Sequence, residues 1–298
     1  GARISIDSHA VEWSANGEPF PVVAGKHVVD ANIDGKTKSV TVPDFLSARS
    51  RGTRLTVLTA YDYSFARLVD EAGVDAILVG DSLGMVIQGH STALPVTLED
   101  MIYHTRCVVR GTTRALVMTD LPFMTFQLGP TQALENAGRL VKEGGAHAVK
   151  LEGGERTAEA IAAIVRADIP VVGHIGLTPQ SVHRFGGFKV QRQEERLLAD
   201  AKAVEQAGAF AVVVECVPTD LAKRITESLS IPTIGIGAGP HCDGQVLVIQ
   251  DMLGMYGDLR PKFVKRYVEA GSSIKEAVAA YCKEVREGKY PSDAFAFQ

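Results

Sequence analysis

The fold is decided by one stretch of the sequence, Ala76-Ile77-Leu78-Val79-Gly80-Asp81-Ser82-Leu83-Gly84-Met85. Its first four residues form an uninterrupted apolar run, which ends at a Gly-Asp-Ser turn. A short apolar run bounded by turn residues is typical of a strand that is buried on both faces, as in a parallel sheet. Asp81 is therefore expected where this strand leaves the core, at its carboxyl end.

Four later runs repeat this design, with helical segments between them. Each combines apolar strand residues with ionisable side chains at its end: Leu116–Asp120, Ala148–Glu152, Val171–His174 and Val212–Glu215. The carboxyl ends of parallel strands that are joined by helices open on the same side of a sheet or barrel. The repeated endings therefore predict a single site rather than several separate ones.

The whole chain predicts an α/β protein, a (β/α)₈ TIM barrel whose eight strands begin at Leu55. The seventh predicted strand covers 232–239, the eighth covers 246–251, and the helix between them looks short or missing. Helices over 262–270 and 274–286 are expected to close the chain. Alternation of strands and helices favours a closed barrel, and a doubly wound open sheet is the alternative.

The domain organisation predicted from this pattern is an N-terminal arm over 1–40 and a barrel catalytic domain over 41–298. In the arm, Gly, Asn, Asp and Lys interrupt every short apolar run. We expect the arm to be partly extended and to pack on a neighbouring subunit; disorder is the alternative.

Composition excludes several functional classes. The chain of 298 residues is 46% hydrophobic and 22% charged, as in globular proteins. Its net charge is −4 and no cationic block occurs, which disfavours nucleic acid and anionic membranes as partners. No apolar run approaches the ~18 residues of a membrane span, and we expect no signal peptide. The four widely spaced cysteines are interpreted as reduced thiols, so the predicted location is the cytoplasm.

Three carboxylates end consecutive predicted strands: Asp81, Asp120 and Glu152. Neighbouring strands lie ~4.8 Å apart, so inward-leaning side chains of the three can reach one cation. Three carboxylates without a nearby thiolate or imidazole suit a hard ion such as Mg²⁺. Alternatively, each carboxylate caps a loop or pairs with an arginine. We favour the metal site because three such groups repel one another unless they are neutralised.

Three further side chains are candidates for binding and proton transfer. Lys150 is two residues before Glu152 and points the same way, where it could bind a substrate carboxylate, neutralise the acidic cluster or form a Schiff base. Glu215 follows a run of valines, and apolar surroundings make a carboxylate a usable general base. His174 either orients substrate, relays a proton or makes a structural hydrogen bond. Together these residues predict a magnesium-dependent enzyme that deprotonates a small 2-oxo acid.

Several longer strings give a more specific indication. They are Leu58–Asp62, Val79–Met85, Gln88–His90, Leu94–Thr97, Asp120–Met124, Val149–Gly154, Gly173–Ser181, Glu215–Pro218 and Gly235–Gly239. With these strings in this order, residues 40–291 resemble the 3-methyl-2-oxobutanoate hydroxymethyltransferase (ketopantoate hydroxymethyltransferase) family. The resemblance implies a barrel of the phosphoenolpyruvate/pyruvate group, assembled into a decamer.

The resemblance also implies an activity and roles for residues. The activity is transfer of a one-carbon unit from 5,10-methylenetetrahydrofolate to 3-methyl-2-oxobutanoate, which gives 2-dehydropantoate for pantothenate and coenzyme A. Position by position, Asp81, Asp120 and Glu152 match the family's magnesium ligands. Asp81, Ser82, Asp120 and Lys150 match its contacts to the 2-oxo acid. Glu215 matches the proton acceptor, and His174 matches a supporting residue.

Two departures and two rival functions remain. The family's loop is longer and contains glycine where this chain has 192–196, and the first 40 residues extend beyond the family's usual start. The rivals are a carbon–carbon lyase or phosphonomutase of the same barrel group, and a catalytically idle barrel that acts as a metabolite sensor or scaffold. A base opposite a metal site argues against the second, because a binding protein needs no base.

Overall fold

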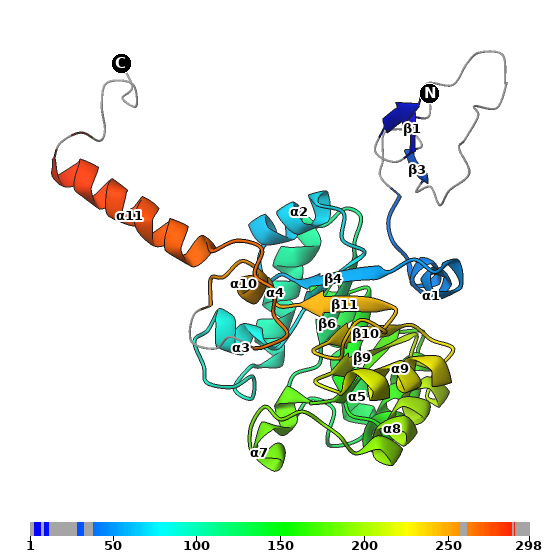
Figure 1. The fold of residues 1–298 in the computed structure, drawn as a ribbon. Coiled ribbons are helices and arrows are strands. Elements are labelled where there is room, and N and C mark those ends of the chain that lie inside the picture. The colour runs from blue at the N-terminus through cyan, green and yellow to red at the C-terminus, as the bar shows by residue number, and fades with distance from the viewer. Residues whose placement is uncertain are drawn as a thin grey trace, which may run out of the picture.

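The computed structural model describes residues 3–6, 9–11, 29–32, 38–256, 261–287 and 289, and its centre is a closed barrel of eight parallel strands (Figure 1). In chain order the strands are β4 (Leu55–Thr59), β5 (Ala76–Val79), β6 (Leu116–Asp120), β7 (Ala148–Glu152), β8 (Val171–Gly176), β9 (Ala211–Glu215), β10 (Thr233–Ile236) and β11 (Gly244–Leu247). Each strand pairs with the next, and β11 pairs with β4. The predicted (β/α)₈ barrel is confirmed, and the open-sheet alternative is excluded.

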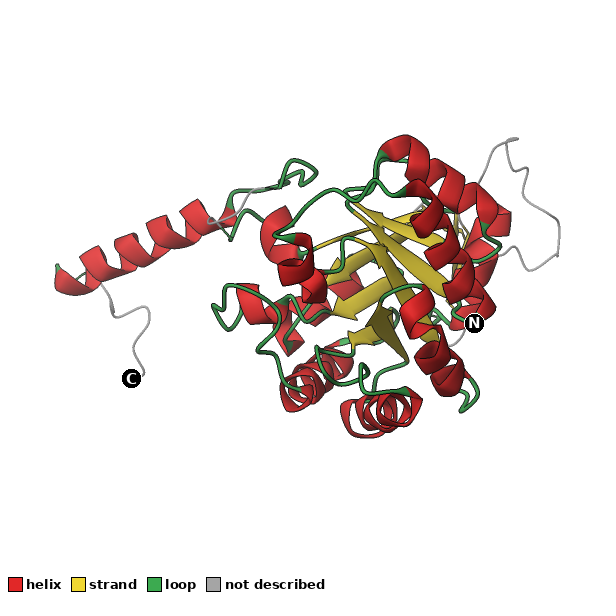
Figure 2. Ribbon diagram, turned by 90° about the horizontal axis from the view of Figure 1, so that it is seen from below, coloured by secondary structure: helices red, strands yellow, loops and turns green. Residues whose placement is uncertain are grey.

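Helices surround the barrel on its outside (Figure 2). The longer ones are α2 (Tyr63–Glu71), α4 (Leu98–Gly111), α5 (Pro130–Arg139), α6 (Ala158–Val165), α8 (Glu194–Gln206) and α9 (Thr219–Ser228). Local sequence explains where they begin: Thr97 caps α4, and its hydroxyl and the Asp100 carboxylate each accept a hydrogen bond from the other residue's backbone N–H. Short segments connect the rest: α3 (Leu83–Val86), η1 (Leu140–Gly144), η2 (Glu155–Thr157), η3 (Pro179–Ser181) and α7 (Val182–Phe185).

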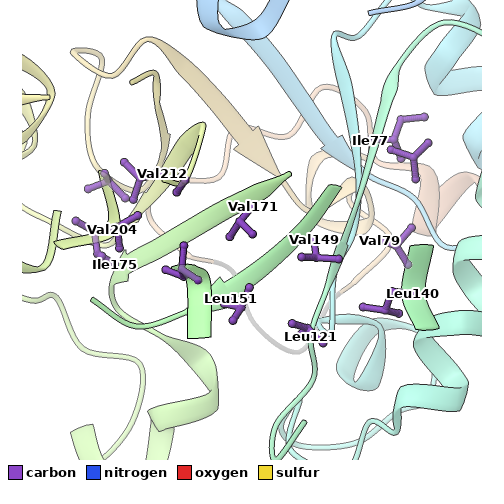
Figure 3. Packing of buried hydrophobic residues seen from close by; sticks show 14 of the residues in the cluster. Ile77, Val79, Leu121, Leu140, Val149, Leu151, Val171, Ile175, Val204 and Val212 are labelled. Atoms are coloured by element: carbon purple, nitrogen blue, oxygen red, sulfur yellow. The ribbon is translucent and has the colours of Figure 1, made fainter. Parts of the chain in front are cut away.

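Strand side chains alternate between two cores. Those that point outward, such as Val149 and Leu151, pack with helix residues such as Val204 of α8 (Figure 3). Those that point inward, such as Ala148 and Met118, fill the barrel lumen. Helix α1 (Val42–Arg51) adds Phe45 to the luminal cluster. Because alternate residues of a strand share a face, the inward positions nearest the carboxyl ends fall on the predicted ionisable residues.

Two predicted elements at the C-terminal side are wrong. The eighth strand is Gly244–Leu247 rather than 246–251, and α10 (Ile249–Met252) follows it, where the N–H of Ile249 donates to the Thr59 hydroxyl at 3.0 Å. The described residues of 262–269 form no helix, and α11 begins at Ala270 instead. As predicted, the described loop between β10 and β11 contains no helix.

Helix α11 (Ala270–Arg286) extends away from the barrel in both views and buries none of its side chains (Figures 1 and 2). At the other end of the chain, β1 (Arg3–Ile6), β2 (His9–Val11) and β3 (Val29–Asn32) form an antiparallel sheet in the order β2-β1-β3. The rest of the predicted arm up to residue 37 lies outside the described residues, and its boundary at 40 stays a prediction. Among the described helices, none combines the length and apolar character that crossing a membrane requires.

Candidate active site

The predicted ionisable residues meet in the barrel mouth. Three come from consecutive strands: Asp81 follows β5, Asp120 ends β6 and Glu152 ends β7; Glu215 ends β9, with β8 between it and β7. The exposed fraction is 4% for Asp81, 4% for Asp120 and 3% for Glu152, so these carboxylates are almost fully removed from water. The side chain of Glu215 is 15% exposed and lies close enough for its charge to act on Asp81. The structure therefore brings these carboxylates together in the mouth, as the strand ends predicted, and their roles stay a prediction.

Lys150 links the acidic residues to His174. Its Nζ lies 3.0 Å from Asp120 Oδ1 and 3.1 Å from His174 Nδ1. Burial by itself would lower the pKa of Lys150, but the carboxylates of Asp120, Glu152 and Asp81 outweigh it and raise this pKa above its ordinary value. Lys150 is therefore a cation, which argues against the Schiff-base alternative, since that chemistry needs the neutral amine.

Gln180 joins two of the carboxylates, and sequence reasoning missed it. Its backbone N–H donates to Glu152 Oε2 at 2.9 Å, and its side-chain amide donates to Asp81 Oδ2 at 2.9 Å. The same amide donates to the carbonyl of Leu121, also at 2.9 Å. Gln180 lies inside the string 173–181, but an amide carries no charge, so a search for ionisable strand ends passes over it.

The acidic cluster of Asp81, Asp120 and Glu152 has too little positive charge around it. Burial first, and then the charge of Asp120, raise the pKa of Asp81 to about 7. Burial and the charge of Asp81 raise the pKa of Glu152 well above its ordinary value. Lys150 is the cation that opposes both shifts. A cluster in this state favours a bound cation, because the ion relieves the mutual repulsion.

The residues of the acidic cluster fit magnesium in their chemistry. They supply oxygen donors only, which is what a hard divalent ion prefers. Within the described part of the chain, no group of three or more His, Cys, Asp or Glu side chains is placed to hold a metal ion. Magnesium usually takes one or two carboxylates and completes its shell with water and substrate oxygens. The cluster therefore suits an ion that is shared with a bound oxo acid.

Glu215 and His174 form a pair beside Lys150 and Glu152. Burial lowers the pKa of His174 well below its ordinary value, and the nearby charge of Lys150 adds to this effect, so the imidazole is neutral. Because an ammonium group can only donate, Nδ1 accepts from Lys150 and the ring proton is on Nε2. Nε2 lies 3.1 Å from Glu215 Oε2, without the alignment of a hydrogen bond. Burial raises the pKa of Glu215 to about 7, although Lys150 opposes the shift.

Ser82, which the resemblance implied for substrate binding, begins the turn after Asp81 and contacts Tyr61. The Tyr61 hydroxyl and the Ser82 hydroxyl lie 2.9 Å apart. Tyr61 is 1% exposed, and burial raises its pKa above the ordinary value, so the phenol stays protonated. Tyr61 belongs to the string 58–62, but its aromatic ring is typical of a core residue, so the sequence by itself indicates no role for it in the site.

A cavity opens beside the acidic cluster. It has a volume of about 360 Å³, and Glu152 and Gln180 form part of its wall. Phe123 and Phe126 line it as well. The cavity thus joins an apolar surface to the charged end of the site, a combination that suits a small organic acid or a ring-bearing ligand.

Comparison with known proteins places the chain among enzymes of one family. The family model described as ketopantoate hydroxymethyltransferase matches residues 39–293. A 3-methyl-2-oxobutanoate hydroxymethyltransferase of Clostridium botulinum (strain 657 / Type Ba4) is 59% identical over 262 residues, which are 87% of this chain and 95% of that protein. One of Geobacter metallireducens is 58% identical over 261 residues, which are 86% of this chain and 98% of that protein.

Solved structures share the fold at low identity. A 2,3-dimethylmalate lyase of the PEP mutase/isocitrate lyase superfamily matches with a TM-score of 0.56 and 16% identity, over 86% of this chain and 91% of the lyase. A phosphonopyruvate hydrolase complex with oxalate and Mg²⁺ matches with a TM-score of 0.56 and 15% identity, over 87% of this chain and 92% of the hydrolase. These likenesses establish the barrel type.

Proposed function

The chain belongs to the ketopantoate hydroxymethyltransferase family, and we propose that it transfers a hydroxymethyl group from 5,10-methylenetetrahydrofolate to 3-methyl-2-oxobutanoate. The product is 2-dehydropantoate. The observation that carries the proposal beyond family membership is the arrangement in the mouth. Glu215, a mostly buried carboxylate with a pKa of about 7, lies close to an acidic cluster in which burial and mutual repulsion raise the pKa of Asp81. Glu215 can take a proton while Lys150 and the acidic cluster hold an oxo acid.

Each residue of the mouth has a role in the proposed reaction. Asp81, Asp120 and Glu152 would hold Mg²⁺, which when bound supplies a Lewis acid that stabilises the enolate. Lys150, a buried cation, binds the carboxylate of the oxo acid, and the Ser82 hydroxyl donates to it. Glu215 takes the hydrogen from the branched carbon, and that carbon forms a bond to the methylene carbon of the folate. The two C–N bonds of the methylene carbon break, water supplies the hydroxyl oxygen, and tetrahydrofolate leaves. His174 stays neutral, with its Nε2 3.1 Å from Glu215 Oε2.

The rival enzyme reading has weaker support. Relatives at 58–59% identity carry the transferase name, whereas the lyase and hydrolase structures share only 15–16% of their residues with this chain. For the assembly, we propose a homo-oligomer, a decamer by analogy with the family, located in the cytoplasm. Ile274, Val278 and Val285 of α11 are exposed at helical spacing, which supports packing of this helix on another copy of the chain.

A steady-state assay with 3-methyl-2-oxobutanoate, 5,10-methylenetetrahydrofolate and Mg²⁺ tests the proposal. We expect 2-dehydropantoate to form only when both organic substrates are present, and turnover to stop when EDTA removes the ion. Cleavage of an oxo acid without folate would support the lyase instead. Full turnover in the presence of EDTA would contradict the magnesium assignment but not the transferase.

A further inference from the structure

A second pocket, the arginine pocket, lies beside the mouth and has no role in the scheme above. Its volume is about 170 Å³, and three arginines line it: Arg156, Arg184 and Arg196. Arg156 belongs to η2 after β7, Arg184 to α7 after β8, and Arg196 to α8. All three thus come from segments that follow the carboxyl ends of two adjacent strands, on the same side of the barrel as the proposed chemistry.

Two of the arginines form no ion pair with a carboxylate of the described residues. Arg196 Nε lies 3.5 Å from Asp200 Oδ2, and the other oxygen of Asp200 accepts the N–H of Glu155 at 2.9 Å. Arg156 donates to the Ser181 hydroxyl at 3.1 Å, and neither Arg156 nor Arg184 forms an ion pair within the described residues. Partial burial, and then the charges of Arg184 and Arg196, lower the pKa of Arg156. The three guanidinium groups therefore repel one another, although the carboxylates of Glu152 and Asp200 partly offset the effect on Arg156.

A buried hydroxyl in the same pocket also lacks a partner. Thr178 lines the pocket, is 3% exposed, and its Oγ1 makes no hydrogen bond with any described residue. Buried polar atoms in proteins are nearly always hydrogen-bonded, so this hydroxyl lacks the partner that a ligand oxygen would supply. The exposed carboxylate of Glu155 also lines the pocket. Because Glu155 repels anions, an anionic ligand can bind only against the arginines.

Arg156 connects the arginine pocket to the larger cavity. It lines both of them, and the larger cavity also contains Glu152 of the acidic cluster together with Phe123 and Phe126. A ligand that spans the two spaces would therefore place a ring-bearing part in the larger cavity, near the acidic cluster. Its anionic part would lie in the arginine pocket, on the other side of Arg156. A methylene folate has this form, because its fused ring and benzoyl group end in a glutamate with two carboxylates.

We propose that the arginine pocket binds the glutamyl carboxylates of the folate co-substrate, through the guanidinium groups of Arg156 and Arg184 and the hydroxyl of Thr178. Guanidinium groups suit this ligand because they bind carboxylates with two parallel hydrogen bonds. The inference rests on the proposed function and names the part of the co-substrate that this chain recognises outside the barrel.

The test compares two co-substrates and a double variant, Arg156→Gln with Arg184→Gln. One co-substrate is 5,10-methylenetetrahydrofolate and the other is 5,10-methylenetetrahydropteroate, which lacks the glutamate. Loss of charged hydrogen bonds is expected to raise KM for the folate about 10- to 100-fold and KM for the pteroate by less than about twofold. The matched control, Arg67→Gln with Arg110→Gln, removes the same two charges from α2 and α4 and should leave both KM values unchanged.

Each outcome separates this inference from the proposed function. An equal rise of KM for both co-substrates, or no rise for either, overturns the arginine pocket as the glutamate site. A wild-type enzyme that consumes no methylene folate overturns the proposed function and this inference together. Should the double variant fold poorly, the single variant Arg184→Gln gives the same comparison, because this exposed side chain makes no ion pair among the described residues. Hydrogen exchange of the oxo acid, which needs no folate, reports an intact mouth.

Discussion

Two buried aspartates at opposite ends of the barrel show how differently one fold uses the same group. Asp70, in the last turn of α2, lies near the amino end of β6 and is 5% exposed. Its carboxylate accepts the backbone N–H groups of Thr113 at 2.8 Å, Arg114 at 3.1 Å and Ala115 at 2.7 Å, and the Thr113 hydroxyl at 2.8 Å. Asp81, at the carboxyl end, is 4% exposed but faces other carboxylates.

The pKa values follow from these surroundings. Burial acts to raise the pKa of both carboxyl groups, but the hydrogen bonds around Asp70 outweigh it and lower that pKa. Around Asp81 the charge of Asp120 adds to burial, and the pKa reaches about 7. The amino end also satisfies Asp75 and Asp243, which accept from Thr56 and Thr233. Polar groups at the amino end thus stabilise the fold. The carboxylates at the carboxyl end repel one another, and a bound cation or ligand can relieve that repulsion.

The largest expected effect is a loss of reaction rate in the variant Glu215→Gln, at the carboxyl end of the barrel. Removing a general base typically lowers a rate about 10²- to 10⁴-fold, and the amide keeps the shape of the side chain. We expect this loss both in product formation and in solvent deuterium exchange at the branched carbon of the oxo acid. Binding of the oxo acid, measured by calorimetry, should persist. Normal exchange in the variant would refute the assignment of the base.

The pH profile of the exchange reaction sharpens the same point. The active form of a base is its deprotonated form, and the pKa of Glu215 is about 7. The exchange rate should therefore rise about tenfold per pH unit below 7 and level off above it.

The next effect concerns the amino end, where Asp70→Asn should lower the free energy of unfolding. The amide would place an N–H₂ group against the donors that Asp70 now satisfies, at a cost of about 2–3 kcal/mol. Because the pKa of Asp70 is lowered in the folded protein, its contribution is present above the unfolded value near 4 and is lost as the pH falls through the folded value. Urea unfolding at pH 7 measures the change. The exposed neighbour Glu71, changed to Gln, should stay within about 0.5 kcal/mol of wild type.

Strand periodicity predicts which ionisable strand residues reach the carboxyl end, because it fixes the direction of their side chains. Once Ala148 and Met118 are assigned to the lumen, alternation brings Lys150, Glu152 and Asp120 into the mouth. What alternation cannot supply is the partner of each group. Gln180 reaches Asp81 and Glu152 from η3, across a distance of 99 residues in sequence for Asp81, and no local pattern predicts that contact.

The bounds predicted for the eighth strand were wrong for a related reason. Val246–Ile249 is apolar throughout, so composition alone predicts a strand there. Pairing with β4 instead places the strand two residues earlier, beginning at Gly244. Gly244 pairs with Leu55, and a Cβ on Gly244 would lie 2.6 Å from the Leu55 carbonyl oxygen. This close approach explains why glycine is required there, and it becomes visible only when the barrel is closed. The hydroxyl of Thr59 then accepts the N–H of Ile249, where α10 begins.

The smallest effect is the most direct test of the comparison, because it predicts that removing a charge from the mouth stabilises the protein. Asp81→Asn keeps an oxygen that can accept from Gln180 but removes the buried charge, and we expect unfolding to require about 1 kcal/mol more at pH 8. A carboxyl group whose pKa rises on folding destabilises the native state progressively as the pH rises from 3.8 to about 7. The gain in the variant should therefore be complete above pH 7 and vanish near pH 4. A variant that is less stable than wild type at pH 8 would mean that Asp81, like Asp70, is held mainly by its hydrogen bonds.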